Sequence, residues 1–527
     1  MGGTSSAQEA LAAGMANGLE APGSLNWIIR GREPVSQLVL DIASQTTESQ
    51  FHDPAGYKGL YAFHKYWGKK PAETISFLID NLTDSNDLIL DPFLGSGAIA
   101  REAISRGRRF LGGDINPISI DLTSTILSIP SPASIKKALK QIEAEVAENI
   151  SKTYLLEDGS CATHYLWDED NLIEVWSKKK GSRTRIEMEP TEHDYRLISG
   201  HADYTPISLR PLRTFKNSRI NSPGKLEWCD LFTGRALHNL ELIRSSILGI
   251  SDVGVRTALL TALTAASGQM SRMVFAIEKR GKSTGQISST RKEVGSWVIG
   301  FWRPKLHFEV NSWNCFTNKA KALIRGLESP GIMPIEISNN LEDLLNLSGR
   351  CCICELDALL LLERLPRRSV DVIITDPPHG DRIPYLELSE IWNAILGKEA
   401  PFEREIVVTN ASERHETSGA YGEKLKQLFM RAGEVINEQG ALVVMFNSRS
   451  KSEWCDLIVA TTAGGLEYAG CFPMAYSAGS VVQDNREGAM KSDYVLVFQP
   501  TSSVANKRIE RLTRLNSWSS SIPFLND

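Results

Sequence analysis

The chain has 527 residues, of which 42% are hydrophobic and 23% charged, and its formal net charge is −5. This length predicts two or more domains, and the composition is that of an ordinary globular protein. The sequence has no run of 18 apolar residues and no secretory signal pattern near its start, so we expect neither a membrane span nor secretion. A nucleic-acid partner remains open, because it needs only a local basic surface.

The eight cysteines show neither disulfide spacing nor a CxxC pair. Three of them, Cys351, Cys352 and Cys354, fall in an apolar run that predicts a buried strand. We therefore expect a reduced, cytoplasmic protein without a structural zinc site or any other metal.

In chain order, residues 1–50 are expected to form a mobile leader, since their first half is rich in Ala, Gly and Ser without a clear period. Residues 51–150 then alternate strand and helix patterns. A strand at 88–90 ends at an aspartate, a glycine turn and a helix at 98–106 follow, and a second strand at 109–113 also ends at an aspartate.

The pattern changes in residues 151–340. Residues 151–228 are polar and are expected to be rich in loops, whereas residues 233–272 are expected to be helical. We interpret 151–340 as a large α+β insertion that serves as the target-recognition region.

Residues 341–505 return to the first pattern. Strands are expected at Cys351–Glu355, Val370–Thr375, Ala441–Phe446 and Tyr494–Phe498, with a helix at Leu359–Leu365. Residues 506–527 are expected to be a tail. Strands that alternate with helices predict an α/β fold with a doubly wound, mostly parallel sheet.

The first motif is the run Asp91-Pro92-Phe93-Leu94-Gly95-Ser96-Gly97, which lies between a strand and a helix. Its two glycines tolerate unusual backbone angles and let a ligand approach closely, and open α/β sheets bind ligands at such strand ends. Alone, the motif is equally compatible with a plain strand-to-helix turn.

Asp114 strengthens the ligand interpretation. It closes the next strand, where an acidic side chain commonly binds ribose hydroxyls. Because the glycine pattern is not GxGxxG, we expect a nucleoside ligand other than a dinucleotide.

The second motif is Thr375-Asp376-Pro377-Pro378-His379-Gly380, again at a strand end. Two prolines fix the backbone and remove two N–H donors, which leaves carbonyl acceptors for an amino group. The Asp376 carboxylate adds an acceptor, and His379 offers a flat face for stacking. A rigid loop without chemistry is the alternative.

Together these motifs resemble those of the amino-methylating DNA methyltransferases, which act on adenine N6 or cytosine N4. The resemblance implies a class I methyltransferase fold and S-adenosyl-L-methionine as cofactor. It also implies double-stranded DNA as substrate, with adenine N6 as the first target, in a restriction-modification or anti-phage setting that can include other subunits. The implied catalytic residues are Asp376, Pro377, Pro378 and His379.

The resemblance also implies the residues that bind the cofactor. The segment His64–Pro71 is similar to the one that lines the methionine end, and Glu355–Ala358 to the one beside the adenine. The implied cofactor-binding residues are Lys65, Trp67, Asp91, Pro92, Phe93, Gly95, Gly97, Asp114 and Asp357.

One departure from the family pattern and one basic loop bear on function. His379 replaces the usual aromatic residue, which leaves a non-catalytic DNA-recognition subunit as an alternative, beside an enzyme that methylates an RNA base amine or a protein amide. The basic loop around residues 279–291 suits contact with phosphates, and a solvated surface loop is the alternative interpretation. The candidate nucleic-acid-binding residues in that loop are Lys279, Arg280, Lys282 and Arg291.

Overall fold

The computed structural model describes residues 57–514 and 518, except residues 180, 182–183, 279, 282–286, 290–291, 298, 330–332, 339, 381–382, 449–450 and 476–491. The predicted leader, residues 1–50, lies outside the described residues. Where the sequence predicted a tail, residues 507–513 form a helix, α18 (Lys507–Thr513), whose Ile509 and Leu512 are buried.

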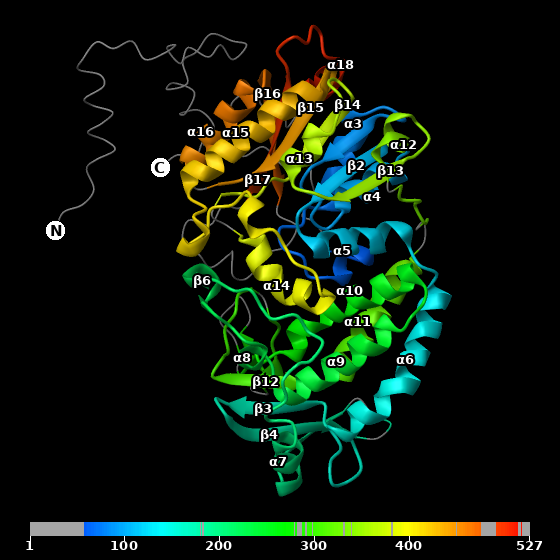
Figure 1. Ribbon diagram of the computed structural model, residues 1–527, viewed down its shortest axis with the longest axis vertical. Coiled ribbons are helices and arrows are strands. Elements are labelled where there is room, and N and C mark those ends of the chain that lie inside the picture. Colours follow the sequence, from blue (N-terminus) through cyan, green and yellow to red (C-terminus); the bar gives the residue numbers. More distant parts are fainter. Residues whose placement is uncertain are drawn as a thin grey trace, which may run out of the picture.

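A seven-stranded sheet occupies the upper part of the molecule in Figure 1, in the order β13-β2-β1-β14-β15-β17-β16. The first five strands pair in parallel, while β17 is antiparallel to both of its neighbours. The sheet is therefore mostly parallel, as predicted. Its strands are β1 (Leu88–Asp91), β2 (Arg109–Asp114), β13 (Cys351–Glu355), β14 (Val370–Thr375), β15 (Ile436–Phe446), β16 (Leu466–Ala475) and β17 (Ser492–Pro500).

Helices cover both faces of this sheet, because alternate strand residues point to opposite sides. Ile89 belongs to one buried apolar cluster and Leu88 and Leu90 to the other. The helices of the first cluster include α3 (Ala72–Leu82), α4 (Ala98–Ser105) and α5 (Pro117–Ser128), and those of the second include α13 (Ala358–Glu363), α15 (Ser418–Val435) and α16 (Lys451–Ala463).

The chain between β2 and β13 builds a second, fully antiparallel sheet in the order β11-β8-β12-β3-β4-β5. The expectation of a loop-rich stretch over 151–228 was wrong there, because three of these strands fall within it. Irregular alternation hid them, since a bulge interrupts the β3–β4 pairing. The strands are β3 (His164–Asp168), β4 (Asn171–Lys178), β5 (Arg185–Met188), β8 (Val274–Ile277), β11 (Glu293–Val294) and β12 (Leu306–Val310).

Helices join the two sheets into one packed body. The predicted helical stretch 233–272 forms α9 (Gly234–Leu248) and α10 (Val253–Met270). In Figure 1, α10 lies between the sheets, in contact with α5 above it and with α14 (Tyr385–Leu396). A single buried apolar cluster runs from the first sheet through these helices, so the middle segment is fixed relative to the sheet.

The remaining elements are short or peripheral. No helix within the described ranges is both long and apolar enough to cross a membrane. These elements are α2 (Leu60–Phe63), α6 (Pro132–Lys152), α7 (Glu192–Ser199), α8 (Trp228–Leu231), α11 (Ser312–Leu327), α12 (Leu341–Leu345), β6 (Lys216–Asn217), β7 (Ser222–Pro223), β9 (Arg280–Gly281) and β10 (Ile287–Ser289), with 3-10 turns at 218–220, 402–404 and 412–414.

Candidate active site

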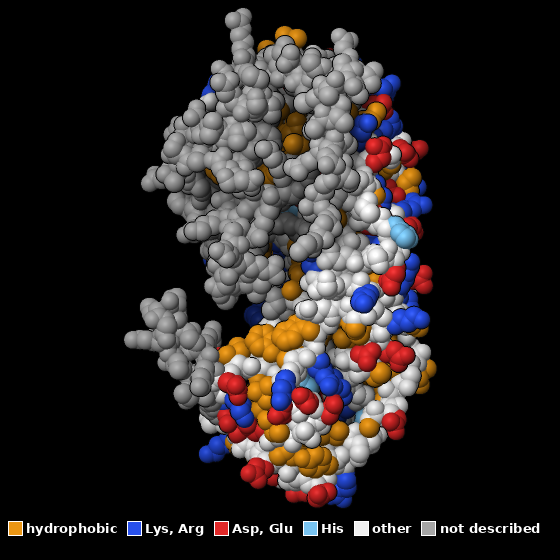
Figure 2. All heavy atoms as spheres, turned by 90° about the vertical axis from the view of Figure 1, so that its left-hand side faces the viewer, with side chains coloured by type: hydrophobic (Ala, Val, Ile, Leu, Met, Phe, Trp, Pro, Cys, Tyr) orange, Lys and Arg blue, Asp and Glu red, His pale blue; other side chains and the backbone are white. Residues whose placement is uncertain are grey.

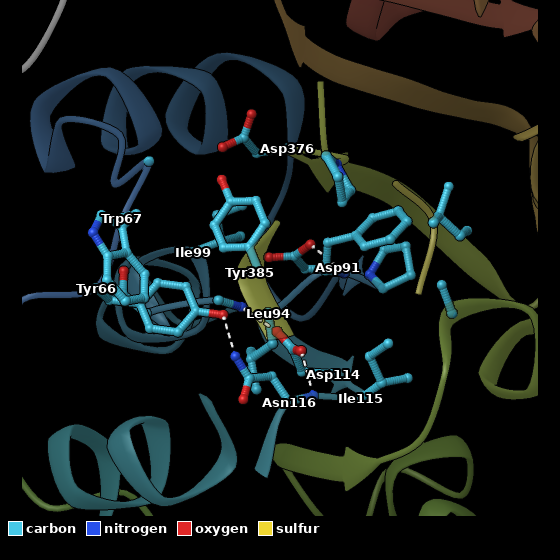
Figure 3. Close-up of a pocket in the computed structure, with 18 of the residues that line it drawn as sticks. Tyr66, Trp67, Asp91, Leu94, Ile99, Asp114, Ile115, Asn116, Asp376 and Tyr385 are labelled. Carbon is cyan, nitrogen blue, oxygen red and sulfur yellow. Dashed lines mark hydrogen bonds between the residues drawn. The ribbon is translucent and has the colours of Figure 1, made fainter. Parts of the chain in front are cut away.

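One cavity opens at the carboxyl ends of β1, β2 and β14 (Figure 3). It holds about 880 Å³ of space unfilled by protein atoms, part of it open to solvent. The loops after the three strands, the segment before α3 and the start of α14 form its walls.

Most of the predicted site residues meet in this cavity. Those that line it are Trp67, Asp91, Pro92, Phe93, Gly95, Asp114, Asp357, Asp376 and Pro378. Four predicted residues do not line it, namely Lys65, Gly97, Pro377 and His379. The predicted nucleic-acid-binding side chains of Lys279, Arg280, Lys282 and Arg291 lie outside the described residues.

The glycine loop between β1 and α4 takes a backbone shape that favours glycine at two positions. Gly95 and Gly97 have φ values of 52° and 75°, in the left-handed region. A Cβ on Gly97 would stand 2.5 Å from the Oγ1 atom of Thr123 on α5. Gly97 therefore serves the packing of the loop against α5, whereas Gly95 faces the cavity.

Asp91 holds the glycine loop to the neighbouring strand. Its Oδ1 accepts hydrogen bonds from the Phe93 backbone N–H at 3.1 Å and from the Thr375 hydroxyl, at the end of β14, at 2.9 Å. Burial raises the pKa of Asp91 to about 8, and the two hydrogen bonds only partly oppose this. Asp91 is therefore protonated at neutral pH and acts as a structural hydrogen-bonding group.

The Asp114 carboxylate is largely occupied by the protein itself. Oδ2 accepts from the Gly95 N–H and the Ser119 hydroxyl, both at 2.8 Å, and Oδ1 accepts from the Asn116 N–H at 2.8 Å. Burial raises its pKa, against these three hydrogen bonds. A carboxylate has about four acceptor positions, so roughly one on Oδ1 is left for a ligand hydroxyl. The sequence had predicted contacts with two ribose hydroxyls.

Asp357 is also engaged within the protein. Its Oδ1 accepts from the Leu360 N–H at 2.8 Å and caps α13, while its Oδ2 pairs with Arg404 at 3.1 Å. Arg404 and its neighbour Glu405 line the same part of the cavity. Asp357 therefore contributes mainly the shape of that wall.

An ammonium group sits beside the predicted catalytic aspartate. Lys70 Nζ lies 3.0 Å from Asp376 Oδ1 and 3.1 Å from Asp493 Oδ2, and the Lys70 side chain is only 9% exposed. Asn447 Nδ2 donates to the other Asp493 oxygen at 2.8 Å. Burial lowers the pKa of Lys70, but the two carboxylates outweigh it and hold that pKa well above its ordinary value. Burial alone would raise the pKa of Asp493, but the Lys70 ammonium outweighs burial, so the pKa of Asp493 is lower than its ordinary value.

His379 turns away from the cavity. Its Nε2 lies 2.9 Å from Asp376 Oδ1 and 3.2 Å from the Met445 carbonyl oxygen, and the side chain is 9% exposed. The ring packs edge-on against Phe446, with the centroids 5.0 Å apart. In this arrangement His379 orients Asp376 and is largely buried.

Aromatic rings fill the opposite wall. Tyr66 and Tyr385 stack with their centroids 6.0 Å apart, and both line the cavity, as Figure 3 shows. Trp67 stacks on Trp392 at 4.5 Å. Lys65, by contrast, points toward the Trp297 carbonyl, and burial, with Lys319 nearby, lowers its pKa to about 8.

Sequence reasoning missed Lys70, Tyr385 and Asp493. Lys70 belongs to the segment His64–Pro71, but the choice among the lysines of that segment depends on side-chain direction. A lone aspartate at the start of the apolar strand β17 was the available signal for Asp493. No group of three or more His, Cys, Asp or Glu side chains in the described ranges is arranged to hold a metal ion.

Comparison with known proteins supports the family resemblance for part of the chain. Residues 33–124 match a family model described as DNA methylase. That range includes the glycine loop and Asp114 and ends before Asp376. The type II methyltransferase M.MjaII of Methanocaldococcus jannaschii is 25% identical over 122 residues, which are 23% of this chain and 22% of the relative. M.MvaI of Kocuria varians is 29% identical over 92 residues, 18% of this chain and 19% of the relative.

The match thus spans about a fifth of the length of each curated relative. Among solved structures, TTHA0409 of Thermus thermophilus complexed with S-adenosyl-L-methionine covers 27% of this chain and 50% of its own, at 14% identity and a TM-score of 0.17. The rRNA methyltransferase aviRa of Streptomyces viridochromogenes covers 93% and 99%, at 11% identity and a TM-score of 0.23. Such low TM-scores support no argument about this chain.

Replacement of Asp91 by asparagine should stabilise the fold increasingly as the pH rises. The pKa of Asp91 is raised from 3.8 to about 8 on folding, so the unfolded chain ionises first and the wild type loses stability across that interval. Asp91→Asn stays neutral, and its advantage should grow by up to about 1.4 kcal/mol per pH unit. Denaturant unfolding at pH 5 and pH 8 tests this. A difference in stability that does not change with pH would show that Asp91 is ionised.

Asp114→Ala should weaken S-adenosyl-L-methionine binding at least about tenfold, or ~1.4 kcal/mol, measured by calorimetry. Both the ligand contact at Oδ1 and the anchor of Gly95 are lost in this variant. Ser119→Ala removes only one internal donor and should cost less. Unchanged affinity in a folded Asp114→Ala protein would remove Asp114 from the ligand site.

Proposed function

We propose that the protein transfers a methyl group from S-adenosyl-L-methionine to an exocyclic amine of a base in double-stranded DNA, with adenine N6 as the first target and cytosine N4 as the second. The observation that carries this proposal is that Asp376 and Pro378 share one cavity with the glycine loop and Asp114. An acceptor for an amine and a binding site for a nucleoside thus face the same space.

The cavity residues fit this cofactor. Gly95 allows close approach, Asp114 keeps one acceptor position for a ribose hydroxyl, and Phe93 and Ile115 provide apolar surface for a base. Lys69 and Lys70 also line the cavity, but their ammonium groups already have partners within the protein. When bound, the cofactor supplies an electrophilic methyl group on a sulfonium.

The structure leaves fewer hydrogen-bond acceptors for the target amine than the sequence predicted. The Pro378 carbonyl accepts from the Tyr421 hydroxyl at 2.8 Å and from the Gly380 N–H at 3.1 Å. It is therefore occupied, which leaves the Oδ2 atom of Asp376 as the favoured acceptor on this loop. The Lys70 ammonium and the His379 ring both lie against the other carboxylate oxygen, Oδ1.

In this mechanism Asp376 Oδ2 accepts a hydrogen bond from the amine and orients the nitrogen lone pair. The bond strengthens as positive charge develops on nitrogen, so it stabilises the transition state more than the bound substrate. A base in a duplex has to leave the stack to reach the cavity. No covalent enzyme intermediate forms, because the amine nitrogen itself bonds to the methyl carbon while the carbon–sulfur bond breaks; the sulfur leaves as a neutral thioether, and the extra proton on nitrogen is lost to solvent.

A second candidate, a DNA-recognition subunit without methyl transfer, draws on one observation. His379 packs against Asp376, is largely buried and does not line the cavity. A role in a restriction-modification or anti-phage system, with other subunits, is compatible with either candidate.

Asp376→Ala should lower the single-turnover rate of methyl transfer to duplex DNA by about 100-fold or more, the scale of losing one preorganised electrostatic partner. Cofactor affinity should change little. Lys70→Met should also slow transfer, because it leaves Asp376 without its ammonium partner. Asp80→Ala, an exposed aspartate that pairs with Arg106 on the surface, is the control and should match the wild type. Equal rates for the wild type and Asp376→Ala would rule out the proposed chemistry.

His379 variants separate the two candidates. His379→Ala should lower turnover by releasing one contact to Asp376, while cofactor affinity is retained. His379→Tyr supplies a larger ring. If this ring stacks on the target base, the stacking should stabilise base binding by ~1–3 kcal/mol. A wild type that binds DNA without methylating it, together with an active His379→Tyr variant, would favour the recognition subunit.

A further inference from the structure

Residues 204–226, which we term the basic strap, carry five basic side chains and no acidic one. The strap follows α7 and includes β6 and β7. The strap is thus locally positive in a chain whose net charge is −5. Its basic residues are Arg210, Arg213, Lys216, Arg219 and Lys225.

The strap is fastened to α14 by acids that lie beneath it. Glu390 Oε1 accepts from Arg210 Nη1 at 2.8 Å and from the Arg213 backbone N–H at 2.6 Å. Glu387 Oε2 accepts from Asn217 Nδ2 at 2.8 Å. Both glutamates are buried, with exposed fractions of 0% for Glu390 and 2% for Glu387. The negative charge that holds the strap is therefore hidden from solvent.

The strap also reaches the wall of the cavity. Phe215 packs against the apolar cluster that contains Leu386, Phe402 and Ile115. Leu386 and Ile115 line the cavity directly. The Arg213 guanidinium lies over the Phe402 ring, 4.9 Å from its centroid. A ligand bound along the strap would thus run past the wall of the cavity that Asp376 also lines.

The outer side of the strap is basic. Arg213, Lys216, Arg219 and Lys225 are exposed, and neither lysine has an ion-pair partner within the described residues. Figure 2 turns the left-hand side of Figure 1, where β6 lies, toward the viewer, and Lys and Arg side chains are present on the lower part of that face, among acidic and hydrophobic ones.

We propose that the basic strap binds the phosphate backbone of the duplex whose base enters the cavity. This inference rests on the proposed function and assigns a location to its nucleic-acid contact. Phosphate backbones favour clustered Lys and Arg held at fixed positions, and such contacts set register rather than sequence preference. The buried anchors on α14 supply that rigidity, and Ser218 and Asn221 add polar side chains between the cations.

The test combines Lys216→Ala, Arg219→Ala and Lys225→Ala in the full chain and measures duplex affinity over a range of salt concentrations. Each lost phosphate contact should flatten the slope of log K against log salt by about 0.9, and affinity near 0.1 M salt should fall about tenfold or more. The loss should be alike for unrelated duplex sequences. S-adenosyl-L-methionine affinity should remain at the wild-type value, because none of the three side chains lines the cavity.

The matched control replaces Lys136, Lys137 and Lys140, three exposed lysines on α6, and should leave affinity and slope unchanged. If the wild type methylates duplex DNA and the strap variant binds the duplex equally well, phosphate binding by the strap is contradicted but the proposed function is not. If the wild type shows no salt-dependent duplex binding, both the proposed function and phosphate binding by the strap are contradicted. Selective loss of an acidic protein partner, with DNA binding intact, would assign the strap to protein contact instead.

Discussion

The site depends on the parallel pairing of β1 with β14, two strands whose end residues Asp91 and Thr375 are 284 positions apart and share a hydrogen bond of 2.9 Å. This pairing brings the glycine loop and the Asp376 loop to one edge of the sheet. The whole second sheet is built by the chain between β2 and β13. Contacts over such separations cost loop-closure entropy, and the continuous apolar core that joins the sheets offsets this cost.

Charge is arranged in pairs around that edge. Lys70 lies between Asp376 and Asp493 and pairs with both. These ion pairs hold together three segments that are distant in the chain: the one before α3, the one after β14 and the start of β17. A buried carboxylate is costly unless it has a partner. Asp91 meets the same constraint differently, by remaining protonated. The two aspartates at neighbouring strand ends thus have different surroundings, since Asp376 lies beside the Lys70 ammonium and Asp91 accepts from a backbone N–H and a hydroxyl.

Much of the fold followed from local patterns, and much of the site did not. Apolar runs that end at Asp91, Asp114 and Asp376 predicted three strands of the sheet and their common edge. The strands of the second sheet were missed, because their polar alternation looked like loop. The direction of His379 and the partners of Lys70 depend on Met445 and Asp493, which come from strands far along the chain. Contacts between residues so far apart in the chain cannot be predicted from the spacing of residues in the sequence.

The most direct test of this account is the identity of the methylated product. The purified protein would be incubated with methyl-deuterated S-adenosyl-L-methionine and with equal amounts of duplex DNA and RNA, and the nucleosides would be separated and identified by mass spectrometry. The account predicts label in N6-methyl-2′-deoxyadenosine, with N4-methyl-2′-deoxycytidine as the second outcome. Label confined to ribonucleosides or to protein, or no label in an enzyme that binds the cofactor, would contradict it.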